Sequence, residues 1–153
     1  MKNFIKSIVK IFSSLQDLSL LIVRFILAYG FYGPAMKKLS NIQNVVVWFR
    51  DGLHLPFPFL NALLAVTTEV SGVILIFIGL MTRFISIPMM VVMVVAITTV
   101  HWSNGFHASN NGFEIPLYYM IMLFVLLSTG PGKFSLDETL FKKYFGSDKQ
   151  FFN

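Results

Sequence analysis

The chain has 153 residues, of which 12 are Lys or Arg and seven are Asp or Glu, so charged residues make up only 12% of it. Apolar residues make up 56% and aromatic residues 16%. A soluble domain of this size cannot cover so much apolar surface with so few charges. The net charge of +5 is concentrated at the ends of apolar segments, which indicates membrane topology. The composition therefore excludes a soluble globule, a disordered chain and a nucleic-acid-binding protein.

Four apolar segments approach the length of about 20 residues that a helix needs to cross the hydrocarbon core of a bilayer. None shows the alternating pattern of a β-barrel strand, and a helix satisfies its backbone groups internally. We therefore expect an all-α membrane protein, a single domain over residues 1–153 built as a bundle of four transmembrane helices. The expected spans are residues 18–36, 59–80, 85–101 and 114–129.

Further elements are expected at the membrane surface. Residues 1–16 carry lysines at every fourth position among apolar residues, a pattern typical of an amphipathic interfacial helix, although a lead-in to the first span is the alternative. The loop after the first span is too apolar to be free, which predicts a short interfacial helix with Trp48 at headgroup depth. Residues 138–153 are expected to form a cytoplasmic tail.

Basic residues set the expected topology, because Lys and Arg concentrate on the cytoplasmic side of membrane proteins. With Arg24 taken as intramembrane, placing the N-terminus in the cytoplasm puts eight basic residues inside and three outside. The inside set is Lys2, Lys6, Lys10, Arg83, Lys133, Lys142, Lys143 and Lys149, and the outside set is Lys37, Lys38 and Arg50. Both termini are therefore predicted to be cytoplasmic.

Arg24 and Glu69 fall within the first and second expected spans, where an ionisable side chain costs several kcal/mol unless it is paired or hydrated. Glu69 lies near the middle of its span and Arg24 about 4–5 Å from the middle of its own, a difference that an Arg side chain can bridge. We therefore predict an ion pair between these helices. The pair either lines a polar cavity for a ligand, to which Tyr32 could donate a hydrogen bond, or clamps the two helices together.

The densest polar cluster is the expected outer loop from His101 to Glu114. We place His101 and Glu114 at the outer mouth of the cavity, where they could exchange protons. Glu114 could equally serve its own helix, because an acid at a helix start suits the helix dipole. His101 and His107 are candidate metal ligands, but a zinc site needs three or four ligands and no such spacing motif is present, so no metal site is predicted.

Several kinds of chemistry are absent from the sequence. The chain has no cysteine, which excludes disulfides, a thiol relay and a thiolate metal site. It also lacks a phosphate-binding loop, a Ser-His-Asp set and any motif for a covalent haem or an iron–sulfur cluster. No catalytic residue is therefore assigned, and an electron donor in any redox role would have to lie on a partner protein.

An ordered set of short motifs resembles the DoxX family over residues 18–140. These motifs are Arg24, Lys38-Leu39, Glu69 with Gly72, Gly79-Leu80-Met81-Thr82-Arg83, His101 with Gly105-Phe106, Gly112-Phe113-Glu114, Gly130-Pro131-Gly132 and Leu136-Asp137. The resemblance implies a four-helix protein of the bacterial inner membrane, and the family's founding association is with the membrane part of a thiosulfate:quinone oxidoreductase. Residues 28–34 and 112–119 resemble a narrower branch encoded beside copper-binding modified peptides, where the proteins are considered accessory or maturation factors.

Two functions follow as hypotheses, and whether the protein is an enzyme stays open. In the first, it is an accessory or maturation factor for a redox- or copper-linked system and docks a small modified peptide on its apolar outer loop. In the second, it is a membrane subunit of an oxidoreductase and binds a quinone or another isoprenoid ligand in the bundle. The lipid bilayer is a partner in both. The expected ligand-binding residues are Arg24, Glu69, Tyr32, His101 and Glu114.

Overall fold

The computed structural model describes residues 2–145, without the side chains of residues 2–11, 13 and 145. Within this part of the chain every regular element is a helix, which confirms the prediction of an all-α membrane protein. The α-helices are α1 (Lys2–Ser40), α2 (Ile42–Val47), α3 (Pro58–Ile78), α4 (Thr82–Ala96), α5 (Glu114–Thr129) and α6 (Leu136–Phe145). Short π-helical and 3-10 turns cover Trp48–Gly52, Ile97–His101, Trp102–Asn104 and Ala108–Asn110.

Three stretches of helix among the described residues are long and apolar enough to cross a membrane, namely Ser14–Ser40, Pro58–Ile78 and Thr82–Asn104. The third exceeds its predicted length because π-helical and 3-10 turns continue α4 beyond Ala96. α5 has the predicted bounds, but its 16 residues extend for only about 24 Å, less than the usual hydrocarbon thickness of about 30 Å. α5 would therefore complete a fourth crossing only with help from its neighbours or from a thinned bilayer.

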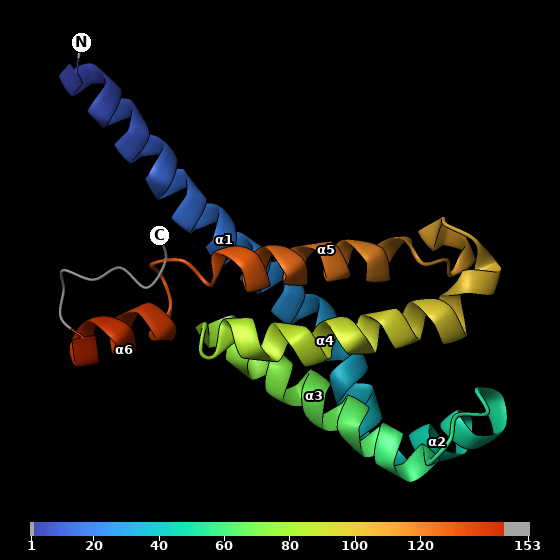
Figure 1. Ribbon diagram of the computed structural model, residues 1–153. Coiled ribbons are helices and arrows are strands. Elements are labelled where there is room, and N and C mark those ends of the chain that lie inside the picture. Colours follow the sequence, from blue (N-terminus) through green and yellow to red (C-terminus); the bar gives the residue numbers. More distant parts are fainter. Residues whose placement is uncertain (1, 146–153) are drawn as a thin grey trace.

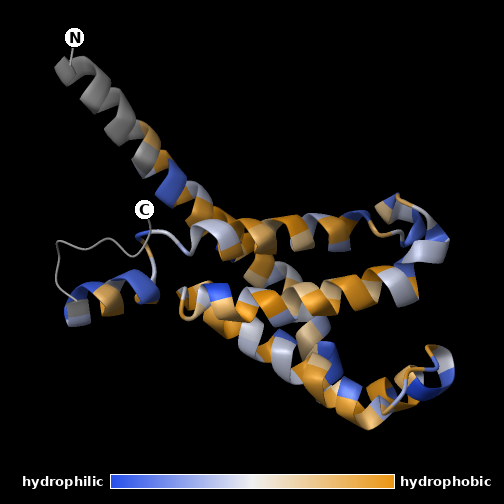
Figure 2. Ribbon diagram, viewed as in Figure 1, coloured by the Kyte–Doolittle hydropathy of each residue, from blue (hydrophilic) through white to orange (hydrophobic). Residues whose placement is uncertain are grey.

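The four longest helices pack as a bundle (Figure 1). α4 and α5 lie side by side, α3 diverges from α4 beyond the tight turn that joins them, and α1 crosses the bundle from α5 to α3 (Figure 1). We call the end where α3 meets α4, near α6, the terminal end. The opposite end, which holds residues 41–57 and 102–113, is the loop end. Apolar residues dominate the lengths of the helices, and polar residues gather towards the ends (Figure 2).

The four helices share one apolar core. Its buried side chains include Leu27, Phe31, Ile76, Met89, Leu123 and Leu126. Gly72 of α3 lies directly against Met89 of α4, and a Cβ at Gly72 would overlap the thioether. Gly72 therefore lets α3 and α4 approach closely, as small residues commonly do between membrane helices.

The two predicted surface helices have different outcomes. The first is continuous with the first span, because α1 runs from Lys2 to Ser40 as one helix, and its placement on the membrane surface stays a prediction. The second is present as α2, followed by the π-helical turn Trp48–Gly52. Val45 and Phe49 are buried against Ala62 of α3, so this helix is fastened to the bundle. Trp48 is 42% exposed, as an interfacial residue would be.

α6 occupies the first part of the predicted tail, and Asp137 joins it to the start of α4. Its carboxylate accepts hydrogen bonds from the backbone N–H of Met81 at 2.7 Å and of Thr82 at 3.1 Å. The backbone N–H of Asp137 donates to the carbonyl of Gly79 at 2.9 Å. Asp137 thus satisfies N–H groups at the N-terminus of α4 that have no partner within that helix. Residues 146–153 of the predicted tail lie outside the described part.

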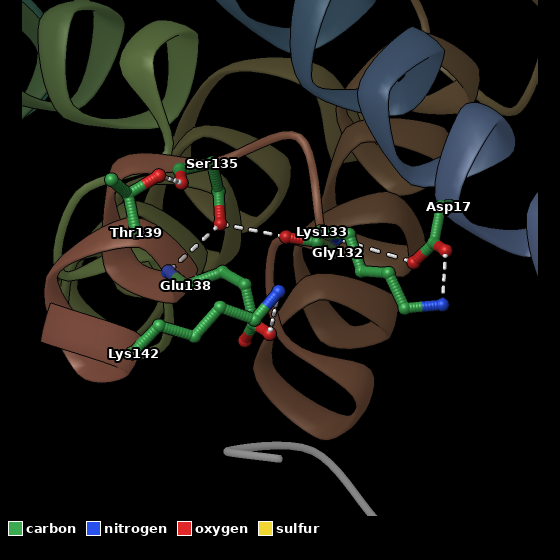
Figure 3. Close-up of polar contacts among 7 residues, drawn as sticks. All are labelled: Asp17, Gly132, Lys133, Ser135, Glu138, Thr139 and Lys142. Carbon is green, nitrogen blue, oxygen red and sulfur yellow. Dashed lines mark hydrogen bonds and ion pairs between the residues drawn. The ribbon is translucent and has the colours of Figure 1, made fainter. Parts of the chain in front are cut away.

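Polar contacts also join the segment before α6 to α1 (Figure 3). Lys133 pairs with Asp17 at 2.9 Å, and the backbone N–H of Lys133 donates to the same carboxylate at 3.2 Å. Ser135 Oγ donates to the carbonyl of Gly132 at 2.6 Å and accepts from the N–H of Glu138 at 3.2 Å. The contacts of Lys133 with Asp17 hold the segment against α1, and the bonds of Ser135 fix the turn that leads into α6.

Arg24 lies at the centre of the terminal end, with only 1% of its surface exposed. Its guanidinium donates four hydrogen bonds of 2.7–3.2 Å to backbone carbonyls at the end of α3 and in the loop before α6. The last carbonyls of a helix carry partial negative charge and lack donors within the helix, so a buried cation can satisfy them. The carbonyls belong to Ile76, Phe77, Pro131 and Phe134.

Replacement of Gly79 by Ala tests this arrangement. Gly79 has a φ of 71°, and a Cβ there would lie 2.6 Å from the Arg24 guanidinium. We expect Gly79→Ala to lower the free energy of unfolding by about 1–3 kcal/mol, because Ala is strained at positive φ and would displace Arg24. Thermal unfolding in detergent, followed by circular dichroism, measures the loss.

Gly33→Ala in α1 is the matched control, because a Cβ at Gly33 has no neighbour within 4 Å and Ala suits a helix better than Gly. We expect this variant to be at least as stable as the wild type. Equal stability of Gly33→Ala and Gly79→Ala would contradict the role given to Arg24 and Gly79.

Candidate functional site

A half-open cavity of ≈310 Å³ lies between the helices towards the loop end. α1, α3, α4 and α5 all contribute to its walls, and the loop before α5 closes it from one side. Most of the wall is apolar, and the polar side chains in it are few. The lining residues that matter for chemistry are Gly30, Pro34, Lys38, Glu69, His101 and Tyr119.

An ion pair between Lys38 and Glu69 forms part of the cavity wall. Glu69 lies near the middle of α3 and is 1% exposed. Lys38 lies near the end of α1, and its ammonium group reaches the Oε1 atom of Glu69. The Oε2 atom is buried and has no hydrogen-bond partner in the described part of the chain. The site therefore holds a carboxylate with one paired and one unpaired oxygen.

The predicted ion pair between Arg24 and Glu69 is wrong, since Arg24 bonds to carbonyls and Glu69 bonds to Lys38. The first span was expected to end at residue 36, which placed Lys38 in an outer loop. α1 continues to Ser40, so Lys38 belongs to the helix. It follows Arg24 by 14 residues, about four helical turns, so both side chains face the same side of α1. Lys38 is the cation closer to the middle of α3.

Tyr119 of α5 contributes a hydroxyl to the cavity in place of the expected Tyr32. Tyr32 is 56% exposed and does not line the cavity. Tyr119 packs its ring against Phe31 with a centroid distance of 5.4 Å, and its hydroxyl lies against Gly30, where a Cβ would overlap it. This hydroxyl has no hydrogen-bond partner among the described residues, so it is available to a ligand.

His101 lines the cavity at the end of the π-helical turn that follows α4, as expected of a residue at its mouth. Its Nδ1 atom lies 2.7 Å from the carbonyl oxygen of Asn111. A carbonyl oxygen can only accept, so Nδ1 carries the hydrogen of this bond, and a neutral ring leaves Nε2 as an acceptor. The side chain of Asn104 donates to the same carbonyl at 3.2 Å, which helps fix the loop under His101.

Glu114 and His107 belong to the framework of the loop. Glu114 does not line the cavity; it accepts from the N–H of Ala108 at 2.9 Å and from the hydroxyl of Tyr118 at 3.1 Å. His107 is exposed and packs edge-on against Phe106. No group of three or more His, Asp or Glu side chains within residues 2–145 is placed to hold a metal ion.

Sequence reasoning missed Lys38 and Tyr119, although each left a signal. Lys38 stands four turns after Arg24, a spacing that places two cations on one face of a helix. Tyr119 is the second of two adjacent tyrosines. The helical period of α5 puts the two on different faces and could have indicated which one faces the bundle. Its facing glycine, Gly30, is visible only in three dimensions.

Comparison with known proteins gives the family. The DoxX family model matches residues 19–102. The chain belongs to the DoxX family. An uncharacterized protein of Haemophilus influenzae is 35% identical to this DoxX protein over 136 residues, which cover 85% of this chain and 87% of that protein. No solved structure matches the chain.

The motifs that resemble the family gather at the two ends of this DoxX protein. At the terminal end, Arg24, the turn at residues 79–83 and Asp137 bond to one another or to shared neighbours. Towards the loop end, Lys38 and Glu69 form the ion pair beside the cavity. The first group serves the fold, and the second provides the polar groups of the candidate site.

A double-mutant cycle tests the Lys38–Glu69 pair. We expect Lys38→Met to lower the free energy of unfolding by about 3 kcal/mol, because it leaves a buried carboxylate without its counter-charge. Adding Glu69→Gln should recover most of that loss, since the neutral amide no longer needs the ammonium group. Chemical denaturation in detergent measures each variant.

Arg24→Met combined with Glu69→Gln is the control for this cycle. Their effects should add to within about 0.5 kcal/mol, because the two side chains share no partner. The assignment fails if Glu69 couples to Arg24 instead of Lys38.

Proposed function

We propose that this DoxX protein binds a small amphiphilic ligand in the cavity and serves a membrane redox system through it, with a quinone as the ligand. The main support is Glu69, a residue that lines the cavity and whose buried Oε2 atom has no hydrogen-bond partner among the described residues. An ionisable group in a membrane span is costly, and such groups usually mark a pathway or a binding site. The Lys38–Glu69 pair therefore does more than join two helices.

The size and polarity of the cavity suit a quinone. Ligand pockets typically have volumes of about 300–1,000 Å³, with apolar walls and a few polar groups that orient the ligand. The side chains of Phe31, Val92 and Met93 offer apolar contacts for a flat ring. Lys38 and Tyr119 offer hydrogen bonds to the ring oxygens. In this role the chain supplies the binding site, and the electrons come from a partner subunit.

The membrane topology belongs to the same proposal. The start of α1 and the helix α6 lie at the same end of the bundle (Figure 1), which supports a topology of four crossings with both termini on one side. Because Lys38 now belongs to the intramembrane pair, only Lys37 and Arg50 remain in the loop-end set of basic residues. The excess of positive charge at the terminal end favours a bacterial inner-membrane protein with cytoplasmic termini. The cavity then opens towards the outer side.

A second candidate is an accessory or maturation role for a copper-binding modified peptide. It is favoured by the apolar surface formed by the segment between α2 and α3 and the first turn of α3, where Trp48, Phe57 and Phe59 are 42%, 77% and 59% exposed. Exposed aromatic groups at a membrane surface suit either the lipid headgroup region or a peptide partner. The cavity is not needed for this role, so the two candidates can be separated.

A cavity-filling substitution tests quinone binding. Ala96 lines the cavity, and Phe at this position should block it, so Ala96→Phe is expected to lose at least about 90% of the quinone that the wild type retains. The measurement is mass spectrometry of lipid-soluble compounds after purification in mild detergent. Val95→Phe is the matched control, because Val95 is 38% exposed and lies outside the cavity lining.

Equal quinone content in the two variants would exclude the cavity as the site. The peptide candidate predicts another result, in which the wild type carries no quinone but retains a peptide that is lost when Phe57 and Phe59 are replaced by Ser.

A further inference from the structure

Glu69 gives the cavity a strong unused hydrogen-bond acceptor. Its Oε1 atom is paired with Lys38, and its Oε2 atom is buried without a donor. An ionised carboxylate can only accept hydrogen bonds. A buried charged acceptor without a partner costs more than a neutral one, so a ligand gains most by bringing a donor to this atom.

His101 adds a second acceptor at the mouth of the cavity. Its Nδ1–H is used by the carbonyl of Asn111, so the neutral ring presents Nε2 with a lone pair. Nε2 accepts no hydrogen bond from any described residue. The hydrogen bond to Asn111 fixes this tautomer whether or not a ligand is bound.

Pro34 removes one backbone donor from the part of α1 that lines the cavity. A proline has no backbone N–H, so Pro34 cannot donate to the carbonyl of Gly30 four residues earlier. Both residues line the cavity. The missing i+4 donor for Gly30 thus falls on a part of α1 that lines the cavity.

The donors in the cavity do not balance these acceptors. Lys38 already donates one hydrogen bond to Glu69, and the Tyr119 hydroxyl can either donate or accept. A ligand hydroxyl can accept from Lys38 or Tyr119 and donate to Glu69. A ligand carbonyl can only accept, which leaves Oε2 of Glu69 unsatisfied.

We propose that the cavity selects ligands that donate hydrogen bonds, so that it holds the hydroxylic, reduced form of a quinone in preference to the carbonyl form. This selectivity rests on the quinone-binding function proposed above. Glu69 is the residue that sets it, because its Oε2 atom is the acceptor that a carbonyl ligand cannot satisfy.

The test compares decylubiquinol with decylubiquinone, which differ by two hydrogen atoms. Dissociation constants are measured anaerobically by equilibrium dialysis at pH 8, with the full-length protein in mild detergent. We expect the quinol to bind about tenfold more tightly, the gain typical of one hydrogen bond to a charged group. In Glu69→Gln the preference should fall to about threefold or less, because the amide N–H can donate to a carbonyl ligand. Val95→Phe, outside the cavity, should keep the tenfold preference.

Each outcome separates the two levels of the proposal. If neither ligand binds, quinone binding and the selectivity both fall. If both bind equally, or the quinone binds more tightly, the selectivity is overturned while quinone binding stands. An unchanged preference in Glu69→Gln also overturns it. Should that variant fail to fold, the dimethyl ether of decylubiquinol serves with the wild type: it must bind no more tightly than the quinone, and binding as tight as that of the quinol refutes the proposal.

Discussion

The carboxylate of Glu69 lies near the middle of α3, where an unpaired charge would cost several kcal/mol in hydrocarbon. The position of Lys38 and the length of α1 meet the need to pair this carboxylate. Lys38 can reach it because α1 continues as a helix to Ser40 and contacts α3. One ammonium group still leaves the Oε2 atom without a partner, and Glu69 lines the cavity. The ion pair thus stabilises the bundle and also leaves a polar group for a ligand.

α1 joins this site to the terminal end. Arg24 and Lys38 stand about four turns apart on one face, and the buried residues Leu27 and Phe31 lie between them. Arg24 donates four hydrogen bonds to backbone carbonyls, so its charged group serves to stabilise the fold. Lys38 satisfies only one oxygen of its partner. Both cations contact α3, but Arg24 stabilises the end of that helix, whereas Lys38 forms part of the cavity wall.

Composition and hydropathy were enough to predict an all-α membrane protein and the approximate positions of its four long helices, because long apolar segments have few alternatives in a bilayer. The residues of the polar clusters were also found, since charges within apolar segments stand out. The partners of these residues were not predicted correctly. The expected spans gave Arg24 and Glu69 matching depths, but Arg24 lies beside Ile76 and Phe77 at the end of α3, because α1 is longer than expected and crosses α3 at an angle that hydropathy leaves undetermined. The backbone carbonyls that hold Arg24 leave no trace in side-chain identity. Tyr119 reaches the cavity because Gly30 lets it approach α1, a contact that only the packed structure reveals.

The most direct test of this account is the protonation state and hydrogen bonding of Glu69 itself. Infrared difference spectra between the wild type and Glu69→Gln, recorded in lipid at neutral pH, isolate the signal of this one side chain. We expect the bands of an ionised carboxylate with inequivalent oxygens, because Lys38 pairs with one oxygen only. These bands should shift when decylubiquinol is added and donates to the free oxygen. A protonated carboxyl band that is unchanged by the quinol would contradict the ion pair and the site built on it.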